Sequence, residues 1–120
     1  MKREVLLYTT VDGKCPLKDF FDSLSKKVFQ KIVWVLQLIK ELENIPSTYF
    51  KKIVNSDDIW ECRVNFSSNT YRIFCFFQNG KIIILTHGIM KKTQKLPQNE
   101  IQRAEEYKKD YLRSSYKMTK

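Results

Sequence analysis

The chain has 120 residues, of which 42% are hydrophobic and 13% aromatic, and its 22 Lys and Arg residues exceed its 13 acidic residues by nine. The apolar content argues against intrinsic disorder, and the length predicts one domain that spans residues 1–120. The net charge of +9 favours a polyanionic partner: nucleic acid, an acidic membrane surface or an acidic protein.

The apolar runs indicate whether the protein crosses a membrane, and the cysteine spacing indicates whether it holds disulfides or a metal ion. No apolar run is long enough to cross a membrane, and the N-terminal residues lack a signal-peptide cleavage pattern, so we expect a cytoplasmic protein without a membrane partner. Cys15, Cys62 and Cys75 have no Cys-x-x-Cys spacing. We therefore expect reduced thiols, no structural metal and no cofactor.

The first half of the chain predicts one strand and two helices. The run EVLLYTT is prone to form a strand and ends in the turn sequence VDGK. Pro16 suits the first turn of a short helix, PLKDFFDSL. A longer helix is predicted over residues 26–43, before the helix-breaking Asn44 and Pro46. Its apolar stripe is typical of a helix that packs on a sheet and includes Val28, Ile32, Val35, Ile39 and Leu42.

The second half predicts three strands and a terminal helix. IWECRVNF alternates in polarity, YRIFCFFQ and KIIILTH are strongly apolar, and Asn79-Gly80 between the last two is typical of a two-residue type I′ hairpin. PQNEIQRAEEYKKDYL then predicts a helix with a narrow apolar side. The expected fold class is α+β: a mainly antiparallel four-stranded sheet, two N-terminal helices on one face and a C-terminal helix, in the order βααβββα.

The hairpin turns predict which side chains share a face of the sheet. A two-residue turn at Asn79-Gly80 places Arg72 opposite His87, and a four-residue SSNT loop places Asn65 opposite Arg72. One face is then apolar and lies beneath the helices, with Trp60, Cys62, Val64, Phe66, Tyr71, Ile73, Cys75, Phe77, Ile82 and Ile84. The other, exposed face carries Glu61, Arg63, Asn65, Arg72, Phe74, Phe76, Ile83, Leu85 and His87.

The same register predicts that Cys62 and Cys75 lie directly opposite each other on the core face. Antiparallel partners have Cα atoms about 4.5–5.5 Å apart, which a disulfide accepts. We expect two buried thiols that an oxidant could link. A Cα separation beyond about 7 Å would contradict the register.

Polar and charged side chains converge at one end of the second face. Each has an ordinary alternative reading: a surface ion pair of little energy, a hydrogen-bonded buried histidine, or a solvated lysine loop. The group consists of Glu61, Arg63, Asn65, Arg72 and His87, with Lys91, Lys92 and Lys95 beside the last strand.

Metal-independent RNA cleavage fits this composition. In that reaction the 2′-OH attacks the neighbouring phosphate, so a protein must remove the 2′ proton, stabilise the pentacovalent phosphorane and protonate the departing 5′ oxygen. Arginine forms charge-assisted, often bidentate hydrogen bonds to phosphate oxygens, and lysine adds positive charge. Histidine and glutamate can transfer protons. The sequence shows no carboxylate cluster that would hold a metal ion.

Four motifs occur in order between Val5 and Leu112: IWECRV, YRIFCFF, KIIILTHGIMKKTQKLP and EIQRAEEY. They resemble the toxins of the RelE/HigB superfamily, in particular its phage-derived, Gp49-like HigB branch. That branch reads W-E-[LI]-R, then Y-R-[IV], then H-x-F-x-K-K-T, then a helix of E-I-x-x-A type. The chain departs from the pattern at Cys62, where an aliphatic residue is usual, and at Ile89, where Phe is common.

The resemblance implies a RelE-like fold and an mRNA interferase. Such an enzyme is a ribosome-dependent endoribonuclease that cuts mRNA in the decoding site and stops translation. By position in the motifs, Arg72 and Lys92 would stabilise the scissile phosphate, and Arg63 and Lys91 would position the RNA backbone. The remaining candidates are His87 and Glu61 for proton transfer, and Asn65 and Lys95 for RNA binding.

The resemblance also implies protein partners. A cognate antitoxin, expected to be a small helix-turn-helix DNA-binding protein, would neutralise the toxin in a heterotetramer, and mRNA and the ribosome would be its targets. The alternative function is a non-catalytic basic module of phage origin that binds RNA or protein.

Overall fold

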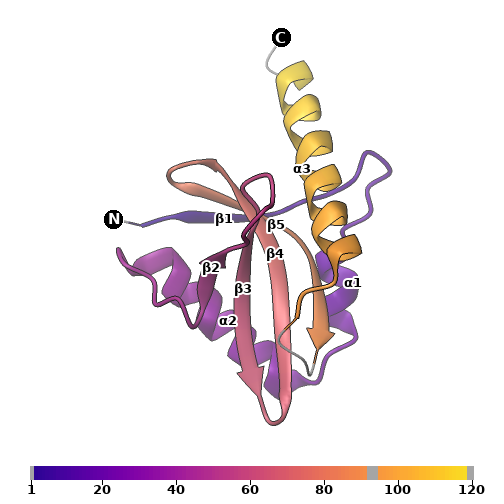
Figure 1. The fold of residues 1–120 in the computed structure, drawn as a ribbon. Coiled ribbons are helices and arrows are strands. Elements are labelled where there is room, and N and C mark those ends of the chain that lie inside the picture. Colours follow the sequence, from indigo (N-terminus) through magenta and orange to yellow (C-terminus); the bar gives the residue numbers. More distant parts are fainter. Residues whose placement is uncertain (1, 92–94, 119–120) are drawn as a thin grey trace.

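The computed structural model describes residues 2–91 and 95–118, with side chains as far as residue 114. A five-stranded sheet is covered by helices on both faces (Figure 1). The predicted α+β class and order of elements are confirmed. The elements are β1 (Glu4–Leu7), α1 (Pro16–Asp22), α2 (Lys26–Glu41), β2 (Phe50–Lys52), β3 (Trp60–Phe66), β4 (Asn69–Asn79), β5 (Ile82–Lys91) and α3 (Gln98–Met118). None of the helices, as far as they are described, has the length and apolar character to cross a membrane.

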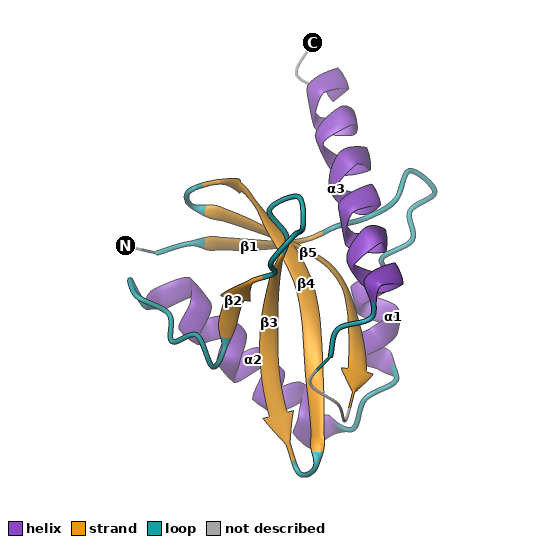
Figure 2. Cartoon of the chain, in the orientation of Figure 1, coloured by secondary structure: helices purple, strands orange, loops and turns teal. Residues whose placement is uncertain are grey.

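The sheet has one more strand than the four that the sequence predicts. Its order is β1-β5-β4-β3-β2, with β1 parallel to β5 and the other pairs antiparallel (Figure 2). The additional strand, β2, is only three residues long: Phe50 is buried in the core, while Lys51 and Lys52 are exposed. Three residues are too few to show the alternating polarity that predicts a strand. β2 is a strand because it pairs with β3.

Side chains cap both ends of α2 with hydrogen bonds to the backbone. The hydroxyl of Ser25 accepts a hydrogen bond from the Val28 amide at the N-terminus. At the C-terminus, the guanidinium group of Arg3 donates to the carbonyls of Ile39, Leu42 and Glu43 at 3.0, 2.6 and 2.9 Å. This cation satisfies carbonyls that the helix leaves without partners and ties β1 to α2. The helix ends at Glu41, two residues before its predicted end.

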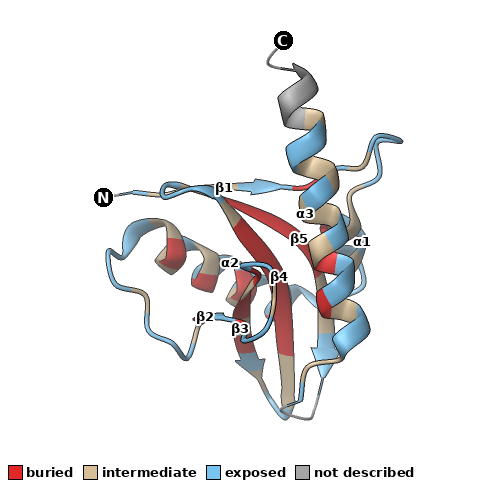
Figure 3. Cartoon of the chain, turned by 45° about the horizontal axis from the view of Figure 1, so that its top comes forward, coloured by how far each residue is buried: buried red, intermediate tan, exposed pale blue. Residues whose placement is uncertain are grey.

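α3 covers the face of the sheet that the sequence predicts to be exposed. α1 and α2 lie behind the sheet and α3 in front of it (Figure 1). The narrow apolar side of α3 is sufficient to dock the helix, because Ile101 and Ala104 are buried against the sheet and Tyr107 packs beside them. Figure 3 shows buried positions on α3 among mostly exposed and half-buried ones. Buried residues of this second core are Tyr8, Ile53, Ile59, Phe74, Phe76, Ile84, Ile101 and Ala104. The prediction that this face is exposed to solvent is therefore wrong, because α3 packs against most of it.

The predicted β3–β4 register is wrong by two residues. Phe66 pairs with Asn69, so the loop has two residues and not four. A shift of two keeps every side chain on its predicted face, since side chains alternate with a period of two. Cys62 therefore faces the core as expected, but it lies opposite Ile73, and Cys75 lies opposite Trp60.

The two cysteines are consequently diagonal neighbours and not direct partners. Diagonal positions are separated by about 7–8 Å, beyond the reach of an unstrained disulfide. Both thiols are fully buried. Burial raises the pKa of Cys62 to about 12 and also raises the pKa of Cys75. Neither thiol forms a thiolate readily, which favours their role as core-filling groups.

The β4–β5 hairpin departs from the predicted register in two places. Asn79 pairs with Ile82, because the Asn79 side chain accepts hydrogen bonds from the amides of Lys81 and Ile82 and shifts the turn to Gly80-Lys81. This turn alone would keep the predicted faces, but β4 carries an extra residue, Gln78, between Phe77 and Asn79. The extra residue moves Ile83 and Leu85 into the α1–α2 core and Ile84 to the α3 side, the reverse of the prediction.

A second irregularity restores the predicted face of His87. β5 carries an extra residue opposite Phe74, where Thr86 donates a hydrogen bond to the Phe74 carbonyl. His87 then lies on the α3 side, stacked on Phe74, while the partner of Arg72 is Ile89. The predicted face of His87 is therefore correct, but its predicted pairing with Arg72 is wrong.

Candidate functional site

Two arginines and one glutamate meet on the α3 side of the sheet. Arg63 on β3 pairs directly with Arg72 on β4, a juxtaposition of like charges that is unfavourable by itself. Glu61 Oε1 accepts a hydrogen bond from Arg72 Nη1 at 2.7 Å and forms an ion pair with Arg63, whose Nε lies 3.2 Å away. Glu61 and Arg72 are buried, whereas the Arg63 side chain keeps 22% of its surface exposed. The carboxylate thereby holds two cations side by side.

These side chains line a hollow of about 430 Å³, which we call the basic hollow. Its other walls come from β2, from the loop that follows β2 and from the start of α3. Four cationic side chains and one carboxylate line it, so its charge is suited to a polyanion. The lining residues are Lys51, Lys52, Ile53, Val54, Glu61, Arg63, Arg72, Leu96 and Ile101.

Sequence reasoning missed Lys51 and Lys52, which β2 brings to this hollow. Lys51 pairs with Glu61 across the β2–β3 ladder, and partners in a ladder share a face. Lys52 forms an ion pair with Asp58 at 2.7 Å, and both side chains are more than half exposed. The pair of adjacent lysines was the only feature of the sequence that could have indicated a role at this site. A three-residue strand gives no indication of which strand it pairs with.

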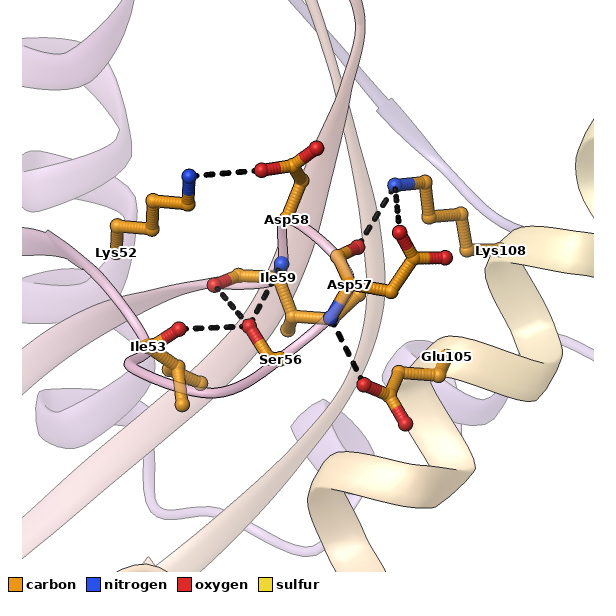
Figure 4. Close-up of polar contacts among 8 residues, drawn as sticks. All are labelled: Lys52, Ile53, Ser56, Asp57, Asp58, Ile59, Glu105 and Lys108. Atoms are coloured by element: carbon orange, nitrogen blue, oxygen red, sulfur yellow. Dashed lines mark hydrogen bonds and ion pairs between the residues drawn. The ribbon is translucent and has the colours of Figure 1, made fainter.

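The loop that walls the basic hollow is held to α3 by polar contacts (Figure 4). Ser56 closes the loop by donating to the Ile53 carbonyl at 2.7 Å and accepting from the Ile59 amide at 3.1 Å. The Asp57 amide donates to Glu105 at 2.9 Å, and Lys108 donates to the Asp57 carbonyl at 2.7 Å. α3 therefore fixes the loop from the side opposite Lys52.

The other predicted RNA-binding residues lie around this hollow but not in it. Lys91 and Lys95 line a separate hollow of about 540 Å³, which shares Leu96 with the basic hollow. Asn65 is exposed at the edge of β3 and accepts a hydrogen bond from Thr70 at 2.8 Å. Lys92, a predicted catalytic residue, lies outside the described residues.

His87 lines none of these hollows, because α3 covers it. It is 2% exposed and is packed between Phe74, with ring centroids 4.7 Å apart, and Tyr107, at 5.6 Å. Its Nε2 lies 3.2 Å from Glu100 Oε1, and its Nδ1 lies 3.1 Å from Thr86 Oγ1. The structure thus brings Glu61, Arg63 and Arg72 together at the basic hollow and places His87 outside its lining.

We predict that His87 makes the stability of the protein depend on pH. Burial, assisted by Arg103 and opposed by Glu100, lowers the pKa of His87 from 6.5 to about 4. Above pH 6.5 the ring is neutral in both states; as the pH falls from 6.5 towards 4, the unfolded chain takes up a proton that the folded protein does not. The free energy of unfolding should therefore be about 2 kcal/mol lower at pH 5 than at pH 7.

Urea unfolding at the two pH values measures this effect, with His87→Gln as the control. His87 is the only histidine of the chain, so the variant should lose most of the difference. A variant with the same pH dependence as the parent would show that carboxyl groups are responsible instead.

Chemically, the basic hollow has the positive charge and the oriented donors that suit an anion. Two guanidinium groups are oriented by a buried carboxylate, and two ammonium groups lie at the rim. Within the described part of the chain, no group of three or more His, Cys, Asp or Glu side chains is placed to hold a metal ion. Such preorganised positive charge is suited to stabilise negative charge that develops on a phosphate.

The family comparison covers the same part of the chain. A model of the family described as "Phage derived protein Gp49-like (DUF891)" matches residues 19–109. No curated protein matches the sequence. The matched segment runs from α1 into α3 and contains Glu61, Arg63, Arg72 and the two lysines of β2. The chain therefore belongs to the phage-derived Gp49-like family.

Proposed function

We propose that this protein is the toxin of a type II toxin–antitoxin pair and cleaves mRNA on the ribosome. The observation that carries the proposal is the arrangement of Arg63 and Arg72, which are held side by side by Glu61 under a hollow with two further cations. Family membership and the resemblance to RelE/HigB toxins support it.

The proposed reaction is attack of an RNA 2′-OH on the adjacent phosphate. The new bond joins the 2′ oxygen to phosphorus, the bond to the 5′ oxygen breaks, and the products are a 2′,3′-cyclic phosphate and a 5′-OH. Arg63 and Arg72 stabilise the phosphorane, and Lys51 or Lys52 protonates the departing 5′ oxygen. Glu61, the one carboxylate that lines the hollow, orients the arginines and is our candidate to accept the 2′ proton.

This assignment changes the roles proposed from the sequence alone. His87 would need α3 to move away before it could reach RNA, so we assign it to the packing of α3. Lys91 and Lys95 lie in the neighbouring hollow, where they can bind the RNA backbone. Lys51 or Lys52 takes over the proton donation to the 5′ oxygen, for which His87 is a candidate in the sequence prediction.

We expect discrete cuts in translated messages when the protein is added to a reconstituted translation reaction. Primer extension locates the 5′ ends, and the cyclic phosphate should block ligation of the upstream fragments until it is removed. The same message without ribosomes should remain intact. Full-length messages with ribosomes present, together with normal growth of cells that express the protein, would leave the non-catalytic basic module as the better function.

The proposed partner is a cognate helix-turn-helix antitoxin, bound in a heterotetramer. A protein with a net charge of +9 should attract a partner with an acidic surface, so the association rate constant should fall as salt is raised from 50 to about 500 mM. Stopped-flow mixing of the protein with the proposed antitoxin measures this association rate constant at each salt concentration. An association rate that does not change with salt would indicate an apolar interface.

A further inference from the structure

A second polar hollow lies at the edge of the sheet beside β3. β2 pairs only with Trp60–Cys62, so β2 does not cover the outer edge of β3 beyond them. A hollow of about 230 Å³ lies at this edge between β3 and α2. We call it the edge hollow; its lining residues are Lys31, Val35, Thr48, Tyr49, Arg63, Val64 and Asn65.

The edge hollow is the neighbour of the basic hollow along β3. Arg63 lines both, and it is the more exposed of the two arginines that Glu61 holds. A linear polyanion with one charged group at Arg63 would therefore reach the edge hollow with its next unit.

The lining of the edge hollow can recognise both a phosphate and a base. Lys31 Nζ donates to the Asn65 carbonyl at 2.5 Å, and an ammonium group has two further donors. Thr48 and Tyr49 contribute hydroxyl groups, and the amide of Asn65 can donate as well as accept. Two cations and no carboxylate line the hollow, so the net charge again favours a polyanion.

An exposed aromatic side chain stands beside this hollow. Trp34 is 52% exposed, and its ring meets the ring of Tyr49 edge-on, with centroids 6.0 Å apart and planes at 86°. Trp34 lies three residues after Lys31 and seven after Lys27, a spacing that puts all three on one side of α2. Exposed aromatic rings among lysines are typical of surfaces that bind single-stranded nucleic acid, because bases stack on the rings and phosphates meet the cations.

We infer that the edge hollow and Trp34 form a subsite for a nucleotide of single-stranded RNA that flanks the scissile one. The flanking phosphate is bound by Lys31 and Arg63, and the flanking base stacks on Trp34. The inference rests on the proposed function, because the basic hollow must hold the scissile phosphate for the edge hollow to receive the neighbour.

The test is binding of fluorescein-labelled 2′-O-methyl oligoribonucleotides, measured by fluorescence anisotropy at low salt. The 2′-O-methyl group blocks attack, so binding is measured without cleavage. Trp34→Ala and Lys31→Gln should each weaken binding of a nine-nucleotide probe by roughly 5- to 30-fold. Binding of a two-nucleotide probe, which cannot fill both hollows, should change little.

Val33→Ala and Lys40→Gln are the matched controls, since they change an exposed apolar residue and a lysine elsewhere on α2. Both should bind the longer probe as the parent protein does. Unfolding midpoints of all four variants establish that they are folded.

The outcomes separate this inference from the proposed function. If Trp34→Ala and Lys31→Gln bind the longer probe normally while Arg63→Gln does not, the subsite is overturned and the basic hollow remains. If the parent binds neither probe, or Arg63→Gln also binds normally, the proposed RNA site fails as well. If Trp34→Ala weakens antitoxin binding but not RNA binding, this surface is a protein interface and the subsite is overturned.

Discussion

Replacing Arg63 with glutamine should slow mRNA cleavage on the ribosome by about 10²–10³-fold, the usual cost of removing one donor to a charge that develops in the transition state. Glutamine retains a hydrogen-bond donor but has no positive charge. The Glu61–Arg72 pair stays in place, with Nη1 and Oε1 2.7 Å apart, so the fold should persist. The measurement is the single-turnover cleavage rate on ribosomes paused at a defined codon.

Arg113→Gln is the matched control for this experiment. It removes the same charge from a side chain that is 66% exposed on α3 and does not line the basic hollow. Its cleavage rate should equal that of the parent. Equal rates for all three proteins would show that Arg63 does not contact the reacting phosphate.

Replacing Arg72 with methionine should lower the free energy of unfolding by about 3–5 kcal/mol, because it leaves a buried carboxylate without its closest cation. Arg72 is 2% exposed and Glu61 4%, so water does not compensate for the loss. Arg63 remains 3.2 Å from Glu61 and offsets part of the cost. Chemical denaturation of the purified protein measures the change.

The double variant Glu61→Leu/Arg72→Met tests whether the buried carboxylate of Glu61 causes the loss of stability in Arg72→Met. Removing both charges should recover part of the stability that Arg72→Met loses, because no buried charge is left without a partner at this pair. An Arg72→Met protein as stable as the parent would show that the pair contributes little. Loss of toxicity in an Arg72 variant therefore cannot by itself assign a catalytic role, and Arg63 is the better probe.

Local patterns in the sequence determined every element except β2, and they determined what α1, α2, β3 and β4 contribute to the α1–α2 core. The stripe of Val28, Ile32, Val35 and Ile39 has the period of a helix, and Pro16 begins α1 as the sequence indicates. These features depend on neighbours within one or two turns. The two arginines and Glu61 were likewise placed on one face correctly, because the period of two in β3 and β4 survives a register error of two residues.

Only the tertiary structure decided how the faces of the sheet are used. The turns at Ser67-Ser68 and Gly80-Lys81, together with the extra residues at Gln78 and opposite Phe74, set the register. Side-chain hydrogen bonds of Asn79 and Thr86 accompany two of these features, and the alternation of polarity in the strands does not encode them. α3 buries His87 and walls the basic hollow, although its own apolar side is narrow. β2 delivers Lys51 and Lys52 to the arginines through a three-residue pairing. Burial, register and edge pairing are long-range properties, and they determine which of the cationic side chains line the basic hollow.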